Sequence, residues 1–241
     1  ALAEYLQEME ADTNNPNRNP NHNNLTISSL AYVTVGTGVV VGLIVNGKPV
    51  HGRMHPEGGH VPVQPLANDT FTGYSWNSHS PFGGYHTVEG LASSVALTER
   101  LEQQQGQGQP EGQGQRLSRS ILADVSDDDE IWDHAANALA NLAVTLLLTL
   151  STEKIVFGGG IMKRPGLLDK IRKRTVVLLN GYLELPEDMS ELITTSRFGQ
   201  DAGLVGAIVL AQRALTTTNT NTYVCAGSDA HVPYHARHRL V

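Results

Sequence analysis

Residues 30–45 read LAYVTVGTGVVVGLIV, and this stretch decides the fold class. Two runs rich in β-branched residues are interrupted by Gly-Thr-Gly at 36–38, which is typical of a β-hairpin. An Asn-Gly dipeptide at 46–47 follows, and such dipeptides favour tight turns between antiparallel strands. Residues 48–50 (KPV) would then form a short returning strand.

A strand followed by three glycines lies in the last third of the chain. Residues 155–157 (IVF) predict a short buried strand, GGG follows at 158–160, and a helical pattern covers residues 165–180. Bare backbone at a helix N-terminus suits the phosphate or ribose of a nucleotide. The G-x-G-x-x-G fingerprint and its acidic residue about 20 positions later are both absent, which disfavours a hydride-transfer enzyme.

The glycine turn of the hairpin has two interpretations. Gly36, Thr37 and Gly38 offer backbone N–H groups and a hydroxyl without obstruction, as loops that cradle phosphate do. The alternative is an ordinary turn, which three residues alone would favour.

Between the two glycine turns lies the sequence HPEGGH at residues 55–60. Glu57 and His60 are separated by two glycines, and Glu89 follows at the start of a helical pattern. Carboxylates and an imidazole on a glycine-rich backbone suit a ligand with several hydroxyl groups. The alternative is a polar loop that carries these side chains by chance.

The remaining periodicity alternates between helices and strands. Ser126 and the acidic residues after it are typical of a helix N-terminus rather than of a metal site. His134, on the same helix, is expected to be packed or surface-exposed rather than a ligand. Helices are predicted over residues 1–11, 88–101, 126–151, 165–180 and 204–215, and a strand over residues 192–195.

Composition excludes several classes of protein. The 241 residues carry a net charge of −7 without a large basic cluster, which disfavours a nucleic-acid partner. The single cysteine, Cys225, excludes an intrachain disulfide. No apolar run reaches the about 18 residues of a membrane span, so we expect no membrane partner. The single cysteine favours a reducing compartment, and we expect a cytoplasmic protein.

In chain order, the motifs resemble the ROK sugar-kinase family and, within it, the bacterial-type fructokinases. They are GTG at 36–38, HPEGGH at 55–60, VEG at 88–90, GGGIMK at 158–163 and QDAGLVGA at 200–207. The resemblance implies an α/β fold, the C-terminal lobe of an actin-like ATPase (ASKHA, ribonuclease H-like), with a mixed sheet flanked by helices.

The resemblance also implies a domain organisation. Residues 1–12 would be the remnant of an inter-lobe helix, and residues 25–215 would form the C-terminal lobe. Residues 13–24 and 102–116 are low-complexity stretches, expected to be a surface insertion and a disordered Gln/Gly insertion. Residues 216–241 would be a flexible tail.

By the same resemblance, the family roles map onto three sets of residues. Glu57, His60 and Glu89 would hold sugar hydroxyls. Gly36, Thr37 and Gly38 would handle phosphate, and Gly158, Gly159 and Gly160 would lie against the nucleoside. The expected cofactors are ATP and Mg²⁺, the expected partner is a hexose, with fructose phosphorylated at O6 favoured, and the expected assembly is a homodimer.

The sequence departs from the family pattern in three ways. The D-x-G-x-T phosphate motif is absent, and the catalytic Asp of the family precedes the segment that residues 1–5 resemble. We therefore expect no catalytic residue here and no turnover by these residues alone. Val40 and Val41 replace bare backbone after the glycine turn.

The third departure concerns the structural zinc of many members. Ser75 and Thr87 stand in the region where the family has thiolates, so we expect no metal site, although His60, His79 and His86 could still supply nitrogens. These departures leave a non-catalytic sugar-binding or regulatory protein as the alternative to a kinase.

Overall fold

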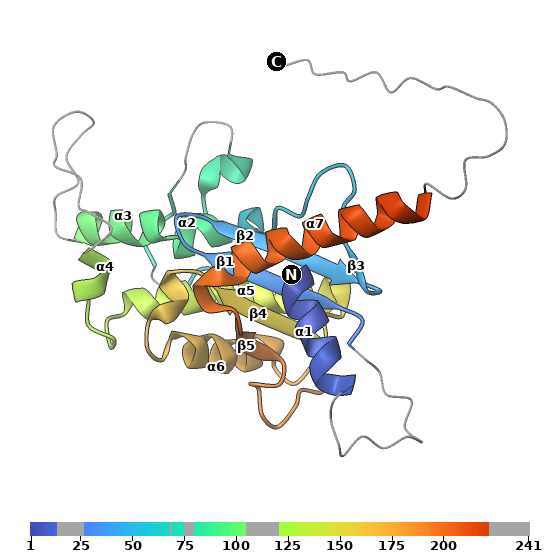
Figure 1. The fold of residues 1–241 in the computed structure, drawn as a ribbon. Coiled ribbons are helices and arrows are strands. Elements are labelled where there is room, and N and C mark those ends of the chain that lie inside the picture. Colours follow the sequence, from blue (N-terminus) through green and yellow to red (C-terminus); the bar gives the residue numbers. More distant parts are fainter. Residues whose placement is uncertain (14–26, 68, 75–79, 105–120, 222–241) are drawn as a thin grey trace, which may run out of the picture.

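The chain folds around a five-stranded mixed sheet in the order β3-β2-β1-β4-β5 (Figure 1). β1 pairs antiparallel with β2 and parallel with β4, and β4 pairs parallel with β5. The strands are β1 Leu30–Val35, β2 Val39–Val45, β3 Lys48–Pro49, β4 Lys154–Gly158 and β5 Ile193–Thr195. This computed structural model describes residues 1–13, 27–67, 69–74, 80–104 and 121–221.

The hairpin forms as the sequence predicts. Val35 pairs with Val39 across the glycine turn, and the Gly36 N–H donates to the Gly38 carbonyl at 2.9 Å. Asn46 and Gly47 have φ angles of 51° and 72°, the left-handed pair that a two-residue type I′ turn requires.

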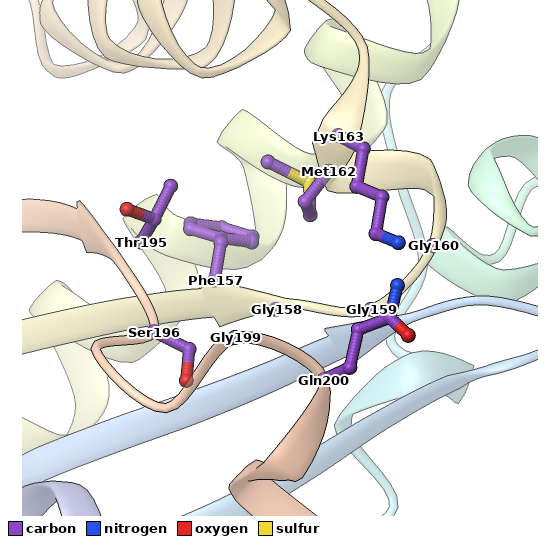
Figure 2. A pocket seen from close by; sticks show the side chains of 10 residues that line it. All are labelled: Phe157, Gly158, Gly159, Gly160, Met162, Lys163, Thr195, Ser196, Gly199 and Gln200. Atoms are coloured by element: carbon purple, nitrogen blue, oxygen red, sulfur yellow. The ribbon is translucent and has the colours of Figure 1, made fainter.

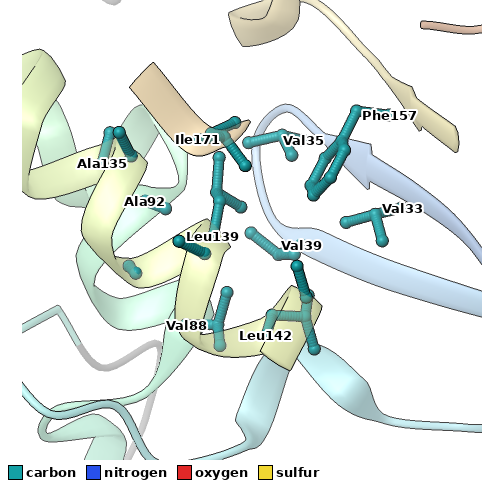
Figure 3. Close-up of a cluster of buried hydrophobic side chains, with 14 of the residues drawn as sticks. Val33, Val35, Val39, Val88, Ala92, Ala135, Leu139, Leu142, Phe157 and Ile171 are labelled. Carbon is teal, nitrogen blue, oxygen red and sulfur yellow. The ribbon is translucent and has the colours of Figure 1, made fainter. Parts of the chain in front are cut away.

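One face of the sheet carries the main core (Figure 3). The central helix α5 is Ala- and Leu-rich, and Leu139 and Leu142 on it are fully buried with Phe157 from β4 in the same cluster. Fully burying one such side chain contributes about 1.5–3 kcal/mol. The helices of this cluster are α2 (Val88–Ala92), α3 (Ser94–Gln104), α4 (Ile121–Asp124), α5 (Ile131–Leu150) and α6 (Leu167–Leu179).

The opposite face is covered by α1 (Leu2–Thr13) and α7 (Ala202–Asn221), which lie in front of the sheet in Figure 1. Leu2 and Tyr5 of α1 pack in a small buried cluster of five residues that spans β1, β2 and β4. α7 leaves Leu204, Leu210 and other apolar side chains exposed. None of the helices in the described ranges is long and apolar enough to cross a membrane.

The predicted helix over residues 88–101 is instead two helices. Ser93 is extended between α2 and α3, and the Ser94 N–H donates to the Gly36 carbonyl at 2.7 Å. The Ser93 hydroxyl accepts from the Ala96 N–H and caps α3. A contact with the hairpin turn therefore breaks the helical pattern.

Several predicted boundaries were wrong. α3 runs to Gln104 and α7 to Asn221, so the predicted insertion and tail begin inside helices, and α1 includes residue 13. α5 begins at Ile131, whose N–H is accepted by the Asp129 carboxylate at 3.0 Å rather than by Ser126. The rest of the predicted insertions and tail (14–24, 105–116 and 222–241) lies outside the described residues.

Candidate functional site

The two glycine turns meet at one edge of the sheet. Thr34 pairs with Gly158 and Phe157 pairs with Thr195 in parallel register, so β1, β4 and β5 end side by side. In α/β sheets, ligands bind outside the carboxyl ends of the strands. This edge is therefore the candidate site.

The triple glycine packs closely against β1. Gly159 has a φ of +97°, and a Cβ on it would overlap the Val35 backbone; a Cβ on Gly158 would overlap the Tyr32 hydroxyl. Gly160 faces open space. Two of the three glycines are thus required by packing, and the third leaves room for a ligand.

The helix after the triple glycine begins later than predicted. A single 3₁₀ turn, η3 (Ile161–Lys163), follows Gly160, and α6 starts at Leu167. The triple glycine therefore does not lie at the N-terminus of α6, and the helix dipole cannot be its contribution to binding.

A cavity of about 560 Å³ opens beside the triple glycine (Figure 2). We call it the triple-glycine cavity; its lining includes Gly158–Gly160, Lys163, Ser196 and Gln200. Phe157 and Met162 add apolar surface, so the cavity offers an apolar wall and bare backbone together. This combination suits a nucleoside.

Ser196 connects the triple-glycine cavity to α1. The Ser196 hydroxyl donates to the buried Glu4 carboxylate, and Glu8 pairs with Lys154 and with Arg197 at 2.7 and 3.1 Å. α1 thus fixes the loop after β5. This link could not be predicted from the sequence, because Glu4 and Ser196 lie far apart in the chain.

The HPEGGH stretch folds onto the start of β2. It contains the 3₁₀ turn η1 (Gly58–His60), and a Cβ on Gly59 would overlap the Val39 carbonyl. A Cβ on Gly58 would lie 2.6 Å from Val41. The two glycines are therefore needed so that η1 can lie directly on the strand.

A short bridge brings Glu89 to the same place. Pro62 pairs with Thr87, and the Val88 N–H donates to the Val61 carbonyl at 3.1 Å. The segments after His60 and before Glu89 therefore run side by side. We call Glu57, His60 and Glu89 the carboxylate cluster.

Within the carboxylate cluster, Glu57 lies between two imidazoles. Its carboxylate is 3.1 Å from His55 Nδ1 and 3.8 Å from His60 Nε2. The Glu57 side chain is 42% exposed and His60 is 28% exposed, so both can reach a ligand from solvent.

Glu89 joins this cluster to the glycine turn of the hairpin. Its Oε2 accepts the Val39 N–H at 2.9 Å and lies 2.5 Å from where a Gly38 Cβ would be. A larger residue at 38 would displace the carboxylate. The structure thus brings all three predicted sugar residues and Gly36–Gly38 together, with the Val39 backbone between them, which the sequence did not predict.

The sequence also did not predict a buried ion pair between the loop after η1 and α3. Asp69 accepts two hydrogen bonds from Arg100 at 2.7 and 2.9 Å, and His134 Nδ1 lies 2.9 Å from Asp69 Oδ2. Arg100 also lies over Phe71, 4.6 Å from the ring centre. The sequence predicted that His134 would be either packed or surface-exposed, and the structure shows that it is packed.

The environment of Asp69 lowers its pKa. Burial by itself would raise the pKa, but the hydrogen bonds and charge of Arg100, with the Phe71 N–H and His134, outweigh burial. Asp69 is therefore held ionised, and it fixes the loop that leads from η1 toward α2.

The structure also shows where Val40, Val41 and the residues related to the family's zinc site lie. Val41 is turned into the core, and only Val40, 58% exposed, stands at the surface beside the glycine turn. Thr87 caps α2 by accepting the Gly90 N–H at 3.0 Å. No metal-binding group of three His, Cys, Asp or Glu side chains occurs among the described residues, which exclude Ser75 and His79.

Comparison with known proteins gives a consistent family. The sequence model of the ROK family matches residues 12–214. A fructokinase from Zymomonas mobilis is 36% identical over 184 residues, covering 76% of this chain and 54% of the relative. A fructokinase from Pediococcus pentosaceus is 31% identical, covering 76% of this chain and 56% of the relative. The chain thus spans about half the length of these relatives.

Solved structures agree on the fold. A glucokinase from Streptomyces griseus in complex with glucose and AMPPNP gives a TM-score of 0.60 at 21% identity, covering 88% of this chain and 67% of that one. A hexokinase from Thermus thermophilus gives 0.59 at 22%, covering 79% and 59%. Both are ROK proteins, and the similarity confirms the expected actin-like fold.

Proposed function

The chain belongs to the ROK family, and from that premise we propose that the whole protein transfers a phosphoryl group from ATP to a hexose. Fructose phosphorylated at O6 is the favoured substrate, because the similar proteins from Zymomonas mobilis and Pediococcus pentosaceus are fructokinases. The observation that carries the proposal is the hydrogen bond from Val39 to Glu89, which ties the carboxylate cluster to the glycine turn.

Phosphoryl transfer depends on positioning and on charge stabilisation more than on covalent chemistry. In our proposal, the carboxylates of Glu57 and Glu89 accept hydrogen bonds from sugar hydroxyls, and the His60 imidazole donates a hydrogen bond to a hydroxyl or accepts one from it. The Glu89 carboxylate touches the turn at Gly38, so a bound hydroxyl would lie beside the loop that handles phosphate. ATP supplies the transferable group, and the cavity beside Gly158, Gly159 and Gly160 would hold its nucleoside.

Two parts of the reaction need groups that these residues do not supply. No carboxylate lines the triple-glycine cavity in the described chain, so its residues do not fit a protein-held Mg²⁺. The D-x-G-x-T motif is absent from the 241 residues. We therefore propose that these residues bind substrates but do not turn them over alone.

A coupled assay that follows ADP release from ATP tests the function. Whole protein is offered fructose, glucose, mannose and N-acetylmannosamine, each with the Glu89→Gln variant as control. We expect the unmodified protein to phosphorylate fructose and the variant to have a kcat/KM for fructose at least about tenfold lower. Absence of turnover with every hexose would contradict the kinase.

The alternative function is non-catalytic sugar binding or regulation. Exposed Val40 beside the glycine turn favours it, because an apolar side chain there obstructs phosphate approach. Calorimetry separates the two, since hexose binding without ATP binding would support the alternative.

The homodimer and the cytoplasmic location stay predictions. Light scattering on the whole protein would test the homodimer.

A further inference from the structure

Two side chains point into the triple-glycine cavity from opposite walls. Lys163 ends η3, and Gln200 lies in the 3₁₀ turn η4 (Gly199–Asp201) before α7. Figure 2 shows the Lys163 ammonium and the Gln200 side-chain amide nitrogen pointing toward one another beside Gly159 and Gly160. The two donors thus converge on a single space.

Neither side chain has a hydrogen bond or an ion pair with any described residue. The neighbouring cation is different. Arg164 donates to the Val125 carbonyl at 3.0 Å and to Asp127 at 2.6 Å, and it lies 4.3 Å from the Trp132 ring centre. Arg164 is therefore held by the fold, whereas Lys163 is available to a ligand.

The charge of the cavity lining indicates the charge of the ligand that would bind there. Among the described residues, Lys163 is the one charged side chain of the triple-glycine cavity, and no Asp or Glu lines it. Lys163 and Gly160 also line a second cavity of about 360 Å³. A lysine ammonium with an amide donor and no carboxylate suits an anion with several oxygens, and a lysine binds such an anion as a point charge.

We propose that Lys163 and Gln200 bind phosphate oxygens of the nucleotide and set the preference for a nucleoside diphosphate or triphosphate over the bare nucleoside. This inference rests on the proposed nucleotide site. The glycine motifs offer only backbone groups to a nucleotide, and Lys163 adds a positively charged side chain.

The experiment is a calorimetric titration of the 241-residue chain with ADP and with adenosine. We expect ADP to bind more tightly than adenosine, because only ADP reaches both donors. Lys163→Met should weaken ADP by about tenfold or more, since hydrogen bonds to charged groups are the strong ones. The same variant should leave adenosine unchanged and make ADP affinity less sensitive to salt.

Two further variants keep the result interpretable. Gln200→Glu, at an exposed position, places a negative charge in the same space and should weaken ADP without affecting adenosine. Lys173→Met removes an exposed lysine on α6 and should change neither affinity. Circular dichroism on each variant checks that the fold is intact.

The outcomes separate the two proposals. If the unmodified chain binds neither ADP nor adenosine, the proposed nucleotide site fails and this inference fails with it. If the chain binds ADP but Lys163→Met binds ADP equally well, or loses ADP and adenosine to the same extent, only the inference is overturned.

Discussion

The carboxylate cluster and the triple-glycine cavity share one edge of the sheet, but they are built in opposite ways. Glu89 is held by the Val39 N–H, and the buried Asp69–Arg100 pair ties the loop between η1 and α2 to α3. In the cavity, Gly160 faces open space, and the Lys163 side chain has no hydrogen-bond or ion-pair partner among the described residues. Glu89 of the cluster is preorganised by the fold, whereas the cavity leaves the side chains of Lys163 and Gln200 to a ligand.

This difference has a chemical meaning. Carboxylates and an imidazole suit a neutral ligand with hydroxyl groups, whereas a lone ammonium suits an anion. A preorganised site should depend strongly on the residues behind it, because little of its geometry is supplied by the ligand. An open site should depend on its own side chains.

The largest expected effect concerns the buried ion pair that holds the loop between η1 and α2. Asp69→Asn should destabilise the protein by about 3–5 kcal/mol, because it leaves the buried Arg100 charge unpaired. The matched control is Asp169→Asn, whose exposed pair with Arg172 contributes about 0.2–1 kcal/mol. Urea unfolding measures the free energy of unfolding of both variants. Equal losses would show that the buried pair contributes no more to stability than the exposed pair does.

The next effect concerns the floor of the triple-glycine cavity. Gly159→Ala should cost about 3 kcal/mol, because the residue has a positive φ and its Cβ would overlap Val35. Gly160→Ala should change stability by less than about 0.5 kcal/mol, since nothing lies within 4 Å of its Cβ. Thermal unfolding compares the two variants, and a destabilised Gly160→Ala would contradict the open wall.

A smaller effect is expected for the carboxylate cluster itself. Glu57→Gln should raise the hexose KM of the whole protein about tenfold, because hydrogen bonds to a charged acceptor contribute about 1.5–3 kcal/mol. The KM for ATP should not change. Glu187→Gln, at an exposed position after α6, is the matched control. A rise in both KM values for Glu57→Gln would argue against separate sites.

The smallest effect is a dependence of stability on pH. The pKa of Asp69 is lower in the folded state, so its contribution is full above the unfolded pKa and is lost as pH falls through the folded pKa. Stability should therefore fall below about pH 4. Asp69→Asn should flatten this fall, as urea midpoints between pH 7 and pH 3 would reveal. An identical pH profile in the variant would contradict the role of Asp69.

The sequence predicted the local features of this fold well. The alternating apolar runs around residues 36–38 and the Asn-Gly turn predicted β1, β2 and β3, because hairpins are determined by neighbouring residues. The family resemblance also assigned Glu57, His60 and Glu89 to one sugar site. Gly59 of η1 and Glu89 both contact Val39, so the segments that carry these residues lie close together, and their role in sugar binding stays a prediction.

Long-range contacts could not be predicted in the same way. Asp69, Arg100 and His134 lie on separate segments, and no spacing rule relates them. The break at Ser93 depends on a hydrogen bond to Gly36 and not on its own propensity. Val39 is an ordinary strand valine in the sequence, and its backbone acquires a role only when η1 and α2 fold onto it.

The most direct test of the account is a cross-comparison of two variants of the 241-residue chain by calorimetry, with fructose and ADP as separate ligands. We predict that Glu89→Gln weakens fructose binding at least about tenfold and leaves ADP binding unchanged, while Lys163→Met does the reverse. If each variant weakened both ligands alike, the two regions would not be separate sites, and the account would be wrong.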